Sequence, residues 1–317
     1  MKTMVVGGAG FIGSHLCDAL LEKGHEVVCI DNFSLGTKKN IEHIMKNDRY
    51  HLYEVDATDK QKLEEVFLKE EPEYVFHLAA NSDIQASSVE PSVEYQNTYT
   101  TTYNILDCMR KYKVKKLFFA STSAVYGDKK DVELREDTPN LSPISYYGAA
   151  KLGSEALISA FSYMNDIQAL IFRFPNVIGP RLTHGVIYDF IRKLEDNNAL
   201  LQILGDGKQT KQYIYVSDLI SAILKFINIQ QKGISLYNLG VDGATSVTSI
   251  ADILCDEMQL SDVKYTYTGG EGGWKGDVPK YSYCLDKIHA KGWKAKYNSD
   301  EAVKKTIQMV LKERKMK

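Results

Sequence analysis

Two side chains that can move a proton stand four residues apart in the middle of the chain. Tyr147 and Lys151 lie in the run Ser-Tyr-Tyr-Gly-Ala-Ala-Lys, residues 145–151. In a helix over 146–163 this spacing places both side chains on one face, one turn apart. A free tyrosine has a pKa of about 10, and a nearby ammonium favours the phenolate and lowers that pKa. Tyr147 is therefore predicted to take a proton from a substrate hydroxyl while hydride leaves the same carbon.

The alternative interpretation is a surface Tyr/Lys pair on an amphipathic helix, since short motifs recur by chance. Tyr146 competes for the same role, but it stands five positions before Lys151 and would face away from it on a helix. A second motif, at the start of the chain, favours the chemical interpretation.

That second motif is a glycine-rich turn. An apolar run over residues 2–6 is followed by Gly-Gly-Ala-Gly-Phe-Ile-Gly at 7–13 and then by apolar residues at helical spacing. Gly7 permits the tight turn, Gly10 lets a pyrophosphate approach the backbone, and Gly13 lets the helix pack close to the strand. The helix N-terminus would face the phosphates of a dinucleotide.

A carboxylate follows at the position that binds the adenosine ribose in dinucleotide-binding folds. A strand over 26–30 ends in Asp31, 18 residues after Gly13. Because a carboxylate there binds the ribose and repels a 2′-phosphate, NAD is predicted as the cofactor in preference to NADP. The nicotinamide cation would also favour the Tyr147 phenolate. Lys38 and Lys39 are interpreted as solvated loop charges.

Strands and helices alternate through the first half of the chain, which predicts an α/β fold with a Rossmann-type, doubly wound parallel sheet. Residues 1–175 are expected to form the NAD-binding domain, with a returning strand near 235–240. Glycine and proline punctuate the remainder, so 176–317 is predicted to be mostly a smaller C-terminal substrate-binding lobe. Further strands are expected over 51–55, 74–78, 116–120 and 168–174, and helices over 39–47, 60–69, 92–112 and 146–163.

Composition excludes several classes. The 317-residue chain has a formal charge of −2 and a pI near 6.4, without the basic excess typical of nucleic-acid binding. Its five cysteines show no close CxxC spacing, which indicates reduced thiols in a cytoplasm and no metal site. No apolar run reaches the ~20 residues of a membrane span, and nothing precedes the first strand that would serve as a signal peptide. A cytoplasmic protein without a membrane partner is expected.

Over nearly its whole length the chain resembles the extended short-chain dehydrogenase/reductase family, in particular its nucleotide-sugar epimerases and dehydratases of the UDP-glucose 4-epimerase type. The resemblance rests on GGAGFIGSH at 7–15, Asp31-Asn32, Asp56-Ala57, His77-Leu78-Ala79-Ala80, and the stretches 121–127, 147–151 and 173–180. It implies that Thr122 hydrogen-bonds the reacting hydroxyl beside Tyr147 and Lys151. It implies NAD contacts at Gly7, Gly10, Phe11, Ile12, Gly13, Asp31, Asn32, Asp56, Ala57, Leu78, Ala79, Ala80, Asn97, Tyr147, Lys151 and Phe174.

The expected substrate is a nucleotide-diphosphate sugar, but the residues that would bind it depart from the family pattern. Asn176 matches an asparagine that touches the sugar nucleotide. Lys211 stands where the family often has arginine, and as a point charge it lacks the guanidinium fork. Trp274 replaces a family arginine, so a phosphate clamp is lost or is supplied by Lys275 or Arg181. The substrate residues expected are Ser82, Ser123, Asn176, Arg181, Gly185, Val186, Lys211 and Trp274.

The residues after Thr122 narrow the reaction. Sugar 4,6-dehydratases carry an acid pair there, and uronate decarboxylases carry a carboxylate at the position of Ala124, whereas this chain has Ser123 and Ala124. The resemblance therefore implies an NAD-dependent nucleotide-sugar 4-epimerase. Hydride would leave carbon 4, the 4-keto sugar would turn over, and hydride would return to its other face.

Two other classes stay open. A nucleotide-sugar 4-dehydrogenase that releases a 4-keto hexose or heptose would use the same residues. A non-enzymatic dinucleotide-sensing protein is disfavoured, because that class often loses the tyrosine or the lysine. His184 is interpreted as a loop or binding residue, with a second acid/base role as the alternative.

The helices expected over 92–112 and 147–163 carry apolar residues on more than one face, which indicates burial on two sides. Related enzymes pair these helices in a four-helix contact, so a homodimer is expected.

Overall fold

The computed structural model describes residues 1–81, 84–130, 132–229, 232–270, 272–273 and 276–315. The chain divides into two compact units. The first contains Met1–Val125, Leu141–Arg173 and Ile220–Tyr237, and the second contains Tyr126–Asn140, Phe174–Leu219 and Asn238–Lys317. The chain therefore passes between the units more than once.

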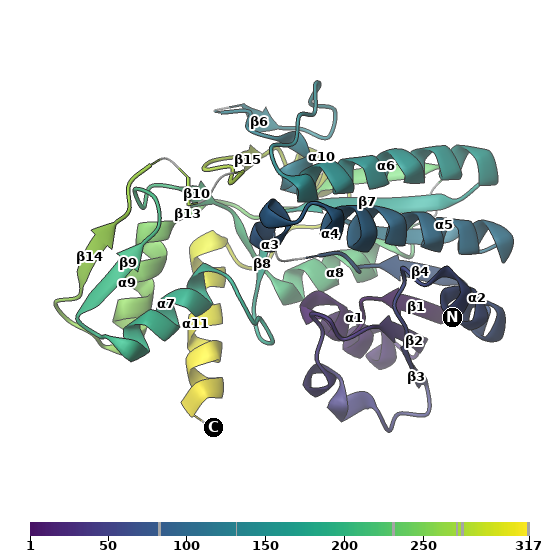
Figure 1. The fold of residues 1–317 in the computed structure, drawn as a ribbon, viewed down its shortest axis with the longest axis horizontal. Helices are drawn as coiled ribbons and strands as arrows, with labels where there is room; N and C mark the ends of the chain where they lie inside the picture. The colour runs from purple at the N-terminus through teal and green to yellow at the C-terminus, as the bar shows by residue number, and fades with distance from the viewer. Residues whose placement is uncertain (82–83, 131, 230–231, 271, 274–275, 316–317) are drawn as a thin grey trace. The chain divides into compact units, whose positions relative to one another are not determined.

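A seven-stranded sheet forms the centre of the first unit, with strand order β12-β7-β5-β4-β1-β2-β3 (Figure 1). The pairs β1–β2, β1–β4, β2–β3 and β4–β5 are parallel. With β1 in the middle and later strands added on both sides, this is the predicted Rossmann-type order. The strands are β1 (Lys2–Val6), β2 (Glu26–Asp31), β3 (Tyr50–Glu54), β4 (Tyr74–His77), β5 (Lys116–Thr122), β7 (Gln168–Phe174) and β12 (Ile234–Asn238).

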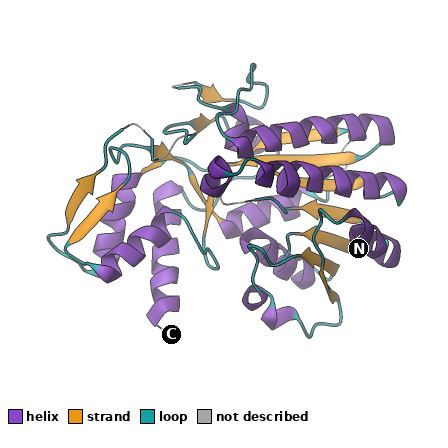
Figure 2. Cartoon of the chain, viewed as in Figure 1, coloured by secondary structure: helices purple, strands orange, loops and turns teal. Residues whose placement is uncertain are grey.

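Helices connect these strands, and α5 and α6 lie side by side (Figures 1 and 2). The helices are α1 (Phe11–Glu22), α2 (Lys60–Glu70), α3 (Ile84–Val89), α4 (Ser92–Glu94), α5 (Thr101–Lys111), α6 (Tyr146–Asn165) and α8 (Val216–Phe226). Short turns of 3-10 helix add η1 (Lys38–Asn40), η2 (Glu42–Ile44) and η4 (Ser123–Tyr126).

Local sequence explains where α2 and α6 begin and where α6 ends. The side chain of Asp59 accepts a hydrogen bond from the Lys62 N–H at the start of α2, and Ser145 does the same for Gly148 at the start of α6. Such caps satisfy N–H groups that have no partner within the helix. Asp166 ends α6 in the left-handed conformation, with φ at +55°.

The helix predicted over 92–112 is wrong in one respect. A π-helical turn, η3 (Tyr95–Thr100), separates α4 from α5. One π turn rotates the side chains beyond it relative to a regular helix, and such turns are frequent at functional sites. The short helix predicted over 39–47 is likewise replaced by the two 3-10 turns η1 and η2.

Among its described residues, the second unit contains the two-stranded sheets β8–β11, β9–β14, β10–β13 and β6–β15. Its helices, drawn with the strands in Figure 2, contribute to an apolar core separate from that of the first unit. Its strands are β6 (Glu133–Leu134), β8 (Asn176–Ile178), β9 (Leu200–Ile203), β10 (Thr210–Lys211), β11 (Tyr213–Tyr215), β13 (Thr245–Ser246), β14 (Lys264–Tyr267) and β15 (Ser282–Tyr283). Its helices are α7 (Val186–Asp196), α9 (Val247–Met258), α10 (Asp286–His289) and α11 (Ser299–Lys315). Within the described part of the chain, no helix has the length and apolar character needed to cross a membrane.

Candidate active site

The first turn of α6 presents the predicted proton acceptor. Tyr147 is half-buried, whereas Tyr146 is 52% exposed, so the competing tyrosine points to solvent. Thr122 is the last residue of β5, and its side chain lies close enough to Tyr147 to lower the pKa of the phenol. The structure therefore brings Thr122 and Tyr147 together although 25 positions of sequence separate them.

Lys151 lies one turn further along α6 and is fully buried. Its Nζ donates a hydrogen bond to the Ala120 carbonyl oxygen at 2.8 Å and lies 5.9 Å from the centroid of the Tyr147 ring. Burial lowers the pKa of Lys151 to about 8, although the carboxylates of Glu94 and Glu155 oppose that shift. Lys151 is thus an interior residue, which argues against the alternative of a solvated surface pair.

The pKa of Tyr147 was predicted to be lowered by Lys151. For the protein side chains alone, this prediction is wrong. Burial raises this pKa, the Glu94 carboxylate raises it further, and only the nearby Thr122 hydroxyl lowers it. The sequence showed the lysine but not the desolvation or the buried carboxylate. Loss of the proton from Tyr147 therefore depends on a further positive charge at the site.

Two buried carboxylates near Lys151 were missed by the sequence reasoning. Glu94 is 2% exposed and accepts hydrogen bonds from Asn81 Nδ2 at 2.9 Å and Thr98 Oγ1 at 2.7 Å. Glu155 binds the guanidinium of Arg173. The sequence could have indicated Glu155, because it follows Lys151 by four residues, just as Lys151 follows Tyr147.

The glycine turn has the backbone geometry of a dinucleotide cradle. Gly7 has φ of +85°, and a Cβ there would lie 2.8 Å from the backbone nitrogen of Ala79. A Cβ at Gly13 would lie 2.0 Å from the Gly7 carbonyl oxygen. Both positions therefore require glycine. Gly10 precedes α1 and supplies no side-chain cap, and the first turn of the helix carries no acidic residue, so its N–H groups suit a phosphate.

Asp31 lies at the carboxyl end of β2 and is 8% exposed. Its carboxylate accepts hydrogen bonds from the Ala9 N–H at 2.9 Å and the Phe33 N–H at 2.8 Å. Burial raises the pKa of this carboxyl group, while the backbone hydrogen bonds oppose that change. Asn40, which the sequence reasoning missed, donates to the Ala9 carbonyl oxygen at 3.0 Å and braces the same turn.

The other predicted cofactor residues are distributed along the carboxyl edge of the sheet and on two helices. Asn32 donates to Asp56 at 2.8 Å, and although burial of Asp56 opposes the change, hydrogen bonds from Thr58 and Asn32 lower the pKa of its carboxyl group. Asn97 is exposed on η3. The remaining positions are Phe11 and Ile12 at the start of α1, buried Ala57 after β3, half-buried Leu78, Ala79 and Ala80 after β4, and Phe174 at the end of β7. These residues fit a dinucleotide through a glycine cradle, a free helix N-terminus and a buried carboxylate.

The second unit holds most of the predicted substrate residues. Asn176 on β8 pairs with buried Tyr213 on β11, and its side chain lowers the pKa of that phenol against the larger effect of burial, which raises it. Lys211 forms an ion pair with Asp277, so its charge is already matched by a carboxylate.

Three more predicted residues lie in the segment before α7. Arg181 is half-buried with φ of +67°, and Gly185, with φ of +105°, precedes Val186 at the start of the helix. His184 is exposed and hydrogen-bonds only its neighbour Thr183 among the contacts of the described residues. Ser82, Trp274 and Lys275 lie outside the described residues. Ser123 is half-buried at the start of η4, in the first unit.

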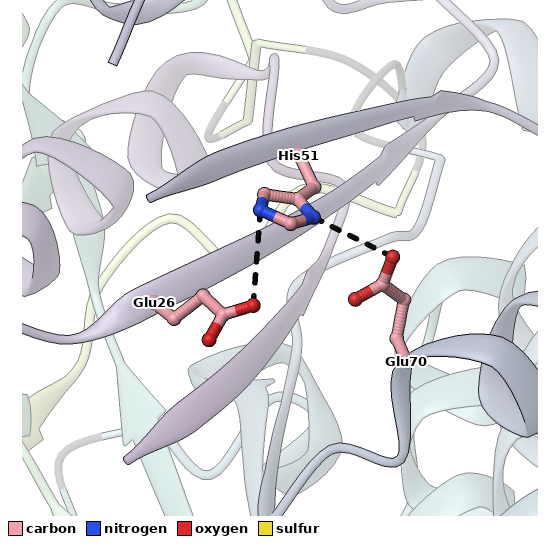
Figure 3. A group of neighbouring side chains, drawn as sticks. All are labelled: Glu26, His51 and Glu70. Carbon is pink, nitrogen blue, oxygen red and sulfur yellow. Dashed lines mark ion pairs between the residues drawn. The ribbon is translucent and has the colours of Figure 1, made fainter. Parts of the chain in front are cut away.

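Another group of ionisable side chains lies at the opposite, amino edge of the sheet. Figure 3 shows the His51 ring between the carboxylates of Glu26 and Glu70, with Nε2 3.7 Å from Glu26 Oε1 and Nδ1 3.5 Å from Glu70 Oε1. These three residues have the composition of a metal site. However, the Lys2 ammonium lies 3.0 Å from an oxygen of each carboxylate. The cluster therefore already contains its cation, and we interpret it as a structural ion network.

Comparison with known proteins finds similar sequences over most of the chain. The model of the NAD dependent epimerase/dehydratase family matches residues 3–240. A putative UDP-glucose 4-epimerase of Methanocaldococcus jannaschii is 33% identical, and the match covers 96% of each chain. The human dTDP-D-glucose 4,6-dehydratase is 30% identical over 97% of this chain and 89% of its own.

Solved structures of two similar proteins superpose along the whole chain. A UDP-galactose 4-epimerase is 36% identical, with a TM-score of 0.86 and 99% of each chain covered. The UDP-glucose 4-epimerase of Thermotoga maritima, solved with UDP-glucose, is 31% identical, with a TM-score of 0.89 and coverage of 99% of this chain and 100% of that one.

Proposed function

Because the chain belongs to the NAD-dependent epimerase/dehydratase family of extended short-chain dehydrogenase/reductases, we propose that it is a nucleotide-sugar 4-epimerase that works through a transient 4-keto sugar. The family makes the protein an NAD-dependent enzyme of the sugar-nucleotide epimerase or dehydratase type. The observation that carries the finer proposal is that half-buried Thr122 and Tyr147 lie beside buried Lys151 in a site where no acid follows Thr122.

The three side chains divide the proton chemistry. The Thr122 hydroxyl hydrogen-bonds the hydroxyl on carbon 4 and aligns it with the Tyr147 oxygen, which receives its proton. The Lys151 ammonium, held by the Ala120 carbonyl, stabilises the Tyr147 phenolate that takes up this proton. NAD, held by the glycine turn and Asp31, would supply a reversible acceptor for the hydride of carbon 4. Tyr147 then returns the proton to the oxygen on carbon 4 as hydride returns to that carbon, so that no net oxidation occurs.

The residues after Thr122 support epimerisation over elimination. A dehydratase needs a group that gives a proton to the leaving hydroxyl of carbon 6, and Ser123 and Ala124 have no acidic side chain. The proposed substrate class, a UDP-sugar, comes from the similar structures, one of which contains UDP-glucose. The basic residues Lys211 and Arg181 of the second unit are the proposed partners of its pyrophosphate.

The test is incubation of the purified protein with UDP-glucose, UDP-galactose and other UDP-, GDP- and CDP-sugars, followed by mass spectrometry and chromatography. An isomer of unchanged mass supports the 4-epimerase. A product lighter by two hydrogen atoms, with NADH accumulating, would establish the 4-dehydrogenase instead. A product lighter by one water would establish dehydration and overturn the argument from Ser123 and Ala124.

A further inference from the structure

Glu155 lies behind the proposed catalytic pair, on the same face of α6. It follows Lys151 by four residues and Tyr147 by eight, which stacks the three side chains on successive turns. Its carboxylate accepts two hydrogen bonds from Arg173, from Nε to Oε1 at 3.0 Å and from Nη2 to Oε2 at 2.6 Å. The Ser121 hydroxyl also donates to Oε1. None of these three residues is more than 8% exposed.

These contacts belong to a larger pattern between β5 and α6. The Ala120 carbonyl accepts from Lys151, and the next residue, Ser121, donates to Glu155. The residue after that, Thr122, lies beside Tyr147. Three consecutive residues of the strand thus each lie against one of the three stacked side chains of the helix, and two of them are hydrogen-bonded to it.

The stability of the fold does not account for this ion pair. Taking a carboxylate and a guanidinium out of water costs several kcal/mol per ion, and well-packed apolar residues in place of such a pair are often as stable or more stable. A bidentate Arg–carboxylate contact does supply a fixed direction and distance. The ion pair therefore contributes geometry, because it fixes the position of α6 relative to the end of β5.

We propose that Glu155, clamped by Arg173 and Ser121, is a positioning residue that sets α6 on β5 and so fixes Tyr147 and Lys151 against Thr122. This inference rests on the proposed function for the meaning of that geometry. Reacting groups must be held within about 0.5 Å of their productive positions, and a displacement of about 1 Å costs ~10²-fold in rate.

Glu155 also contributes charge at the site. Four groups face Lys151: Glu94 of α4, Glu155 and Tyr147 of its own helix, and His77 of β4, while Arg173 of β7 lies beyond Glu155. Burial lowers the pKa of Lys151, and the Glu155 carboxylate opposes that change. Without Glu155 the pKa of Lys151 falls further, so the ammonium is lost at a lower pH.

The test is the double variant Glu155→Leu with Arg173→Met, which removes both charges and leaves neither one buried alone. We expect a folded protein with near wild-type NAD affinity, a kcat for UDP-galactose reduced ~10²-fold and a KM changed much less. The alkaline limb of the kcat profile should move to lower pH. The matched control is Lys2→Met with Glu70→Gln, which disrupts the ion network at the other edge of the sheet and should leave kcat and its pH profile unchanged. Wild-type kcat with an unmoved alkaline limb in the folded Glu155/Arg173 variant overturns the proposal.

Ser121→Ala keeps the ion pair and removes one contact, and it decides the question if the double variant does not fold. We expect kcat to fall about 10-fold, the size of one net hydrogen bond of about 1.4 kcal/mol, with KM unchanged. An unchanged kcat in this variant contradicts the proposal.

A readout without substrate separates this inference from the proposed function. The wild type and the Glu155/Arg173 double variant are each compared with a derivative that also carries Lys151→Met. The difference in unfolding free energy between each protein and its derivative is measured as a function of pH. In the double variant the contribution of Lys151 should begin to rise at a lower pH than in the wild type, and an identical profile counts against Glu155. If the wild type turns over none of the sugar nucleotides, the proposed function fails, while this comparison still decides on Glu155.

Discussion

Gly148 lies directly against the carbonyl group of Ala124. A Cβ at Gly148 would lie 2.6 Å from the Ala124 carbonyl oxygen and 3.1 Å from its carbonyl carbon, closer than a side chain tolerates. The first turn of α6 can therefore approach the residues after Thr122 only because position 148 is glycine. That approach is what places Tyr147 beside Thr122.

We expect Gly148→Ala to push the first turn of α6 away from η4 and to lower kcat ~10²-fold with little effect on NAD affinity. Gly153→Ala is the matched control on the same helix. Its Cβ would lie 3.0 Å from the Tyr99 ring, a side chain that can move, so kcat should stay near wild type. Steady-state kinetics of the two variants checks this. Equal kcat values would show that the Gly148–Ala124 contact does not set the site.

Tyr147→Phe should reduce turnover by ~10²–10⁴-fold, the usual cost of losing general acid/base assistance. The ring remains, so NAD should stay bound, as shown by equilibrium dialysis. Tyr146→Phe, which changes an exposed phenol, serves as the control and should behave as the wild type does. Wild-type turnover by the Tyr147 variant would remove this residue from the mechanism.

Lys151→Met should abolish turnover and stabilise the fold at neutral pH. The pKa of Lys151 is lowered to about 8 from an ordinary 10.5, so between these values the unfolded chain holds a proton that the folded chain has lost. The unfolding free energy of the wild type therefore rises with pH across this window and lacks that contribution below it. At pH 7 the variant avoids burying the ammonium and should be more stable by about 1–3 kcal/mol.

Urea unfolding at pH 7 and at pH 9.5 measures both effects. The gap between Lys151→Met and the wild type should narrow at the higher pH. A variant that is less stable than the wild type at pH 7 would mean that the lysine stabilises the core rather than straining it.

Asp31→Ala should weaken NAD more than NADP. The carboxylate braces the glycine turn through Ala9 and Phe33, and it is also the group proposed to bind the adenosine ribose. Glu54→Ala, at an exposed residue at the end of the neighbouring strand, is the control. Fluorescence titration with both cofactors gives the ratio of affinities. A native protein that prefers NADP would contradict the assignment of Asp31.

The protein should be a dimer joined through α5, η3 and α6. Tyr95 and Tyr103 are 65% and 42% exposed, and Ala156 and Ala160 are exposed on α6, so these helices keep an uncovered apolar face. Ala160→Glu would place a charge in the contact and should yield a monomer by light scattering at micromolar concentration. Leu68→Glu, at an exposed apolar residue of α2, should not. A monomeric wild type would refute the expectation.

Local spacing in the sequence was sufficient to predict much of the fold and of the candidate site. Glycines at fixed intervals, a tyrosine and a lysine one turn apart, and strands alternating with helices depend on contacts within a few residues of one another. For that reason the sheet, the glycine cradle and the helix carrying Tyr147 and Lys151 were all predictable. Even the family followed from motifs of this local kind.

The features that only the tertiary structure decided depend on contacts between residues that are distant in sequence. Ser121 and Glu155 are 34 positions apart, and Arg173 lies 18 beyond Glu155, so no local pattern shows that the three form one buried cluster. The Tyr147 pKa reverses direction for the same reason, because burial and the Glu94 carboxylate come from other elements of the fold. Electrostatics and desolvation act through space, and the sequence carries them only after the chain has folded.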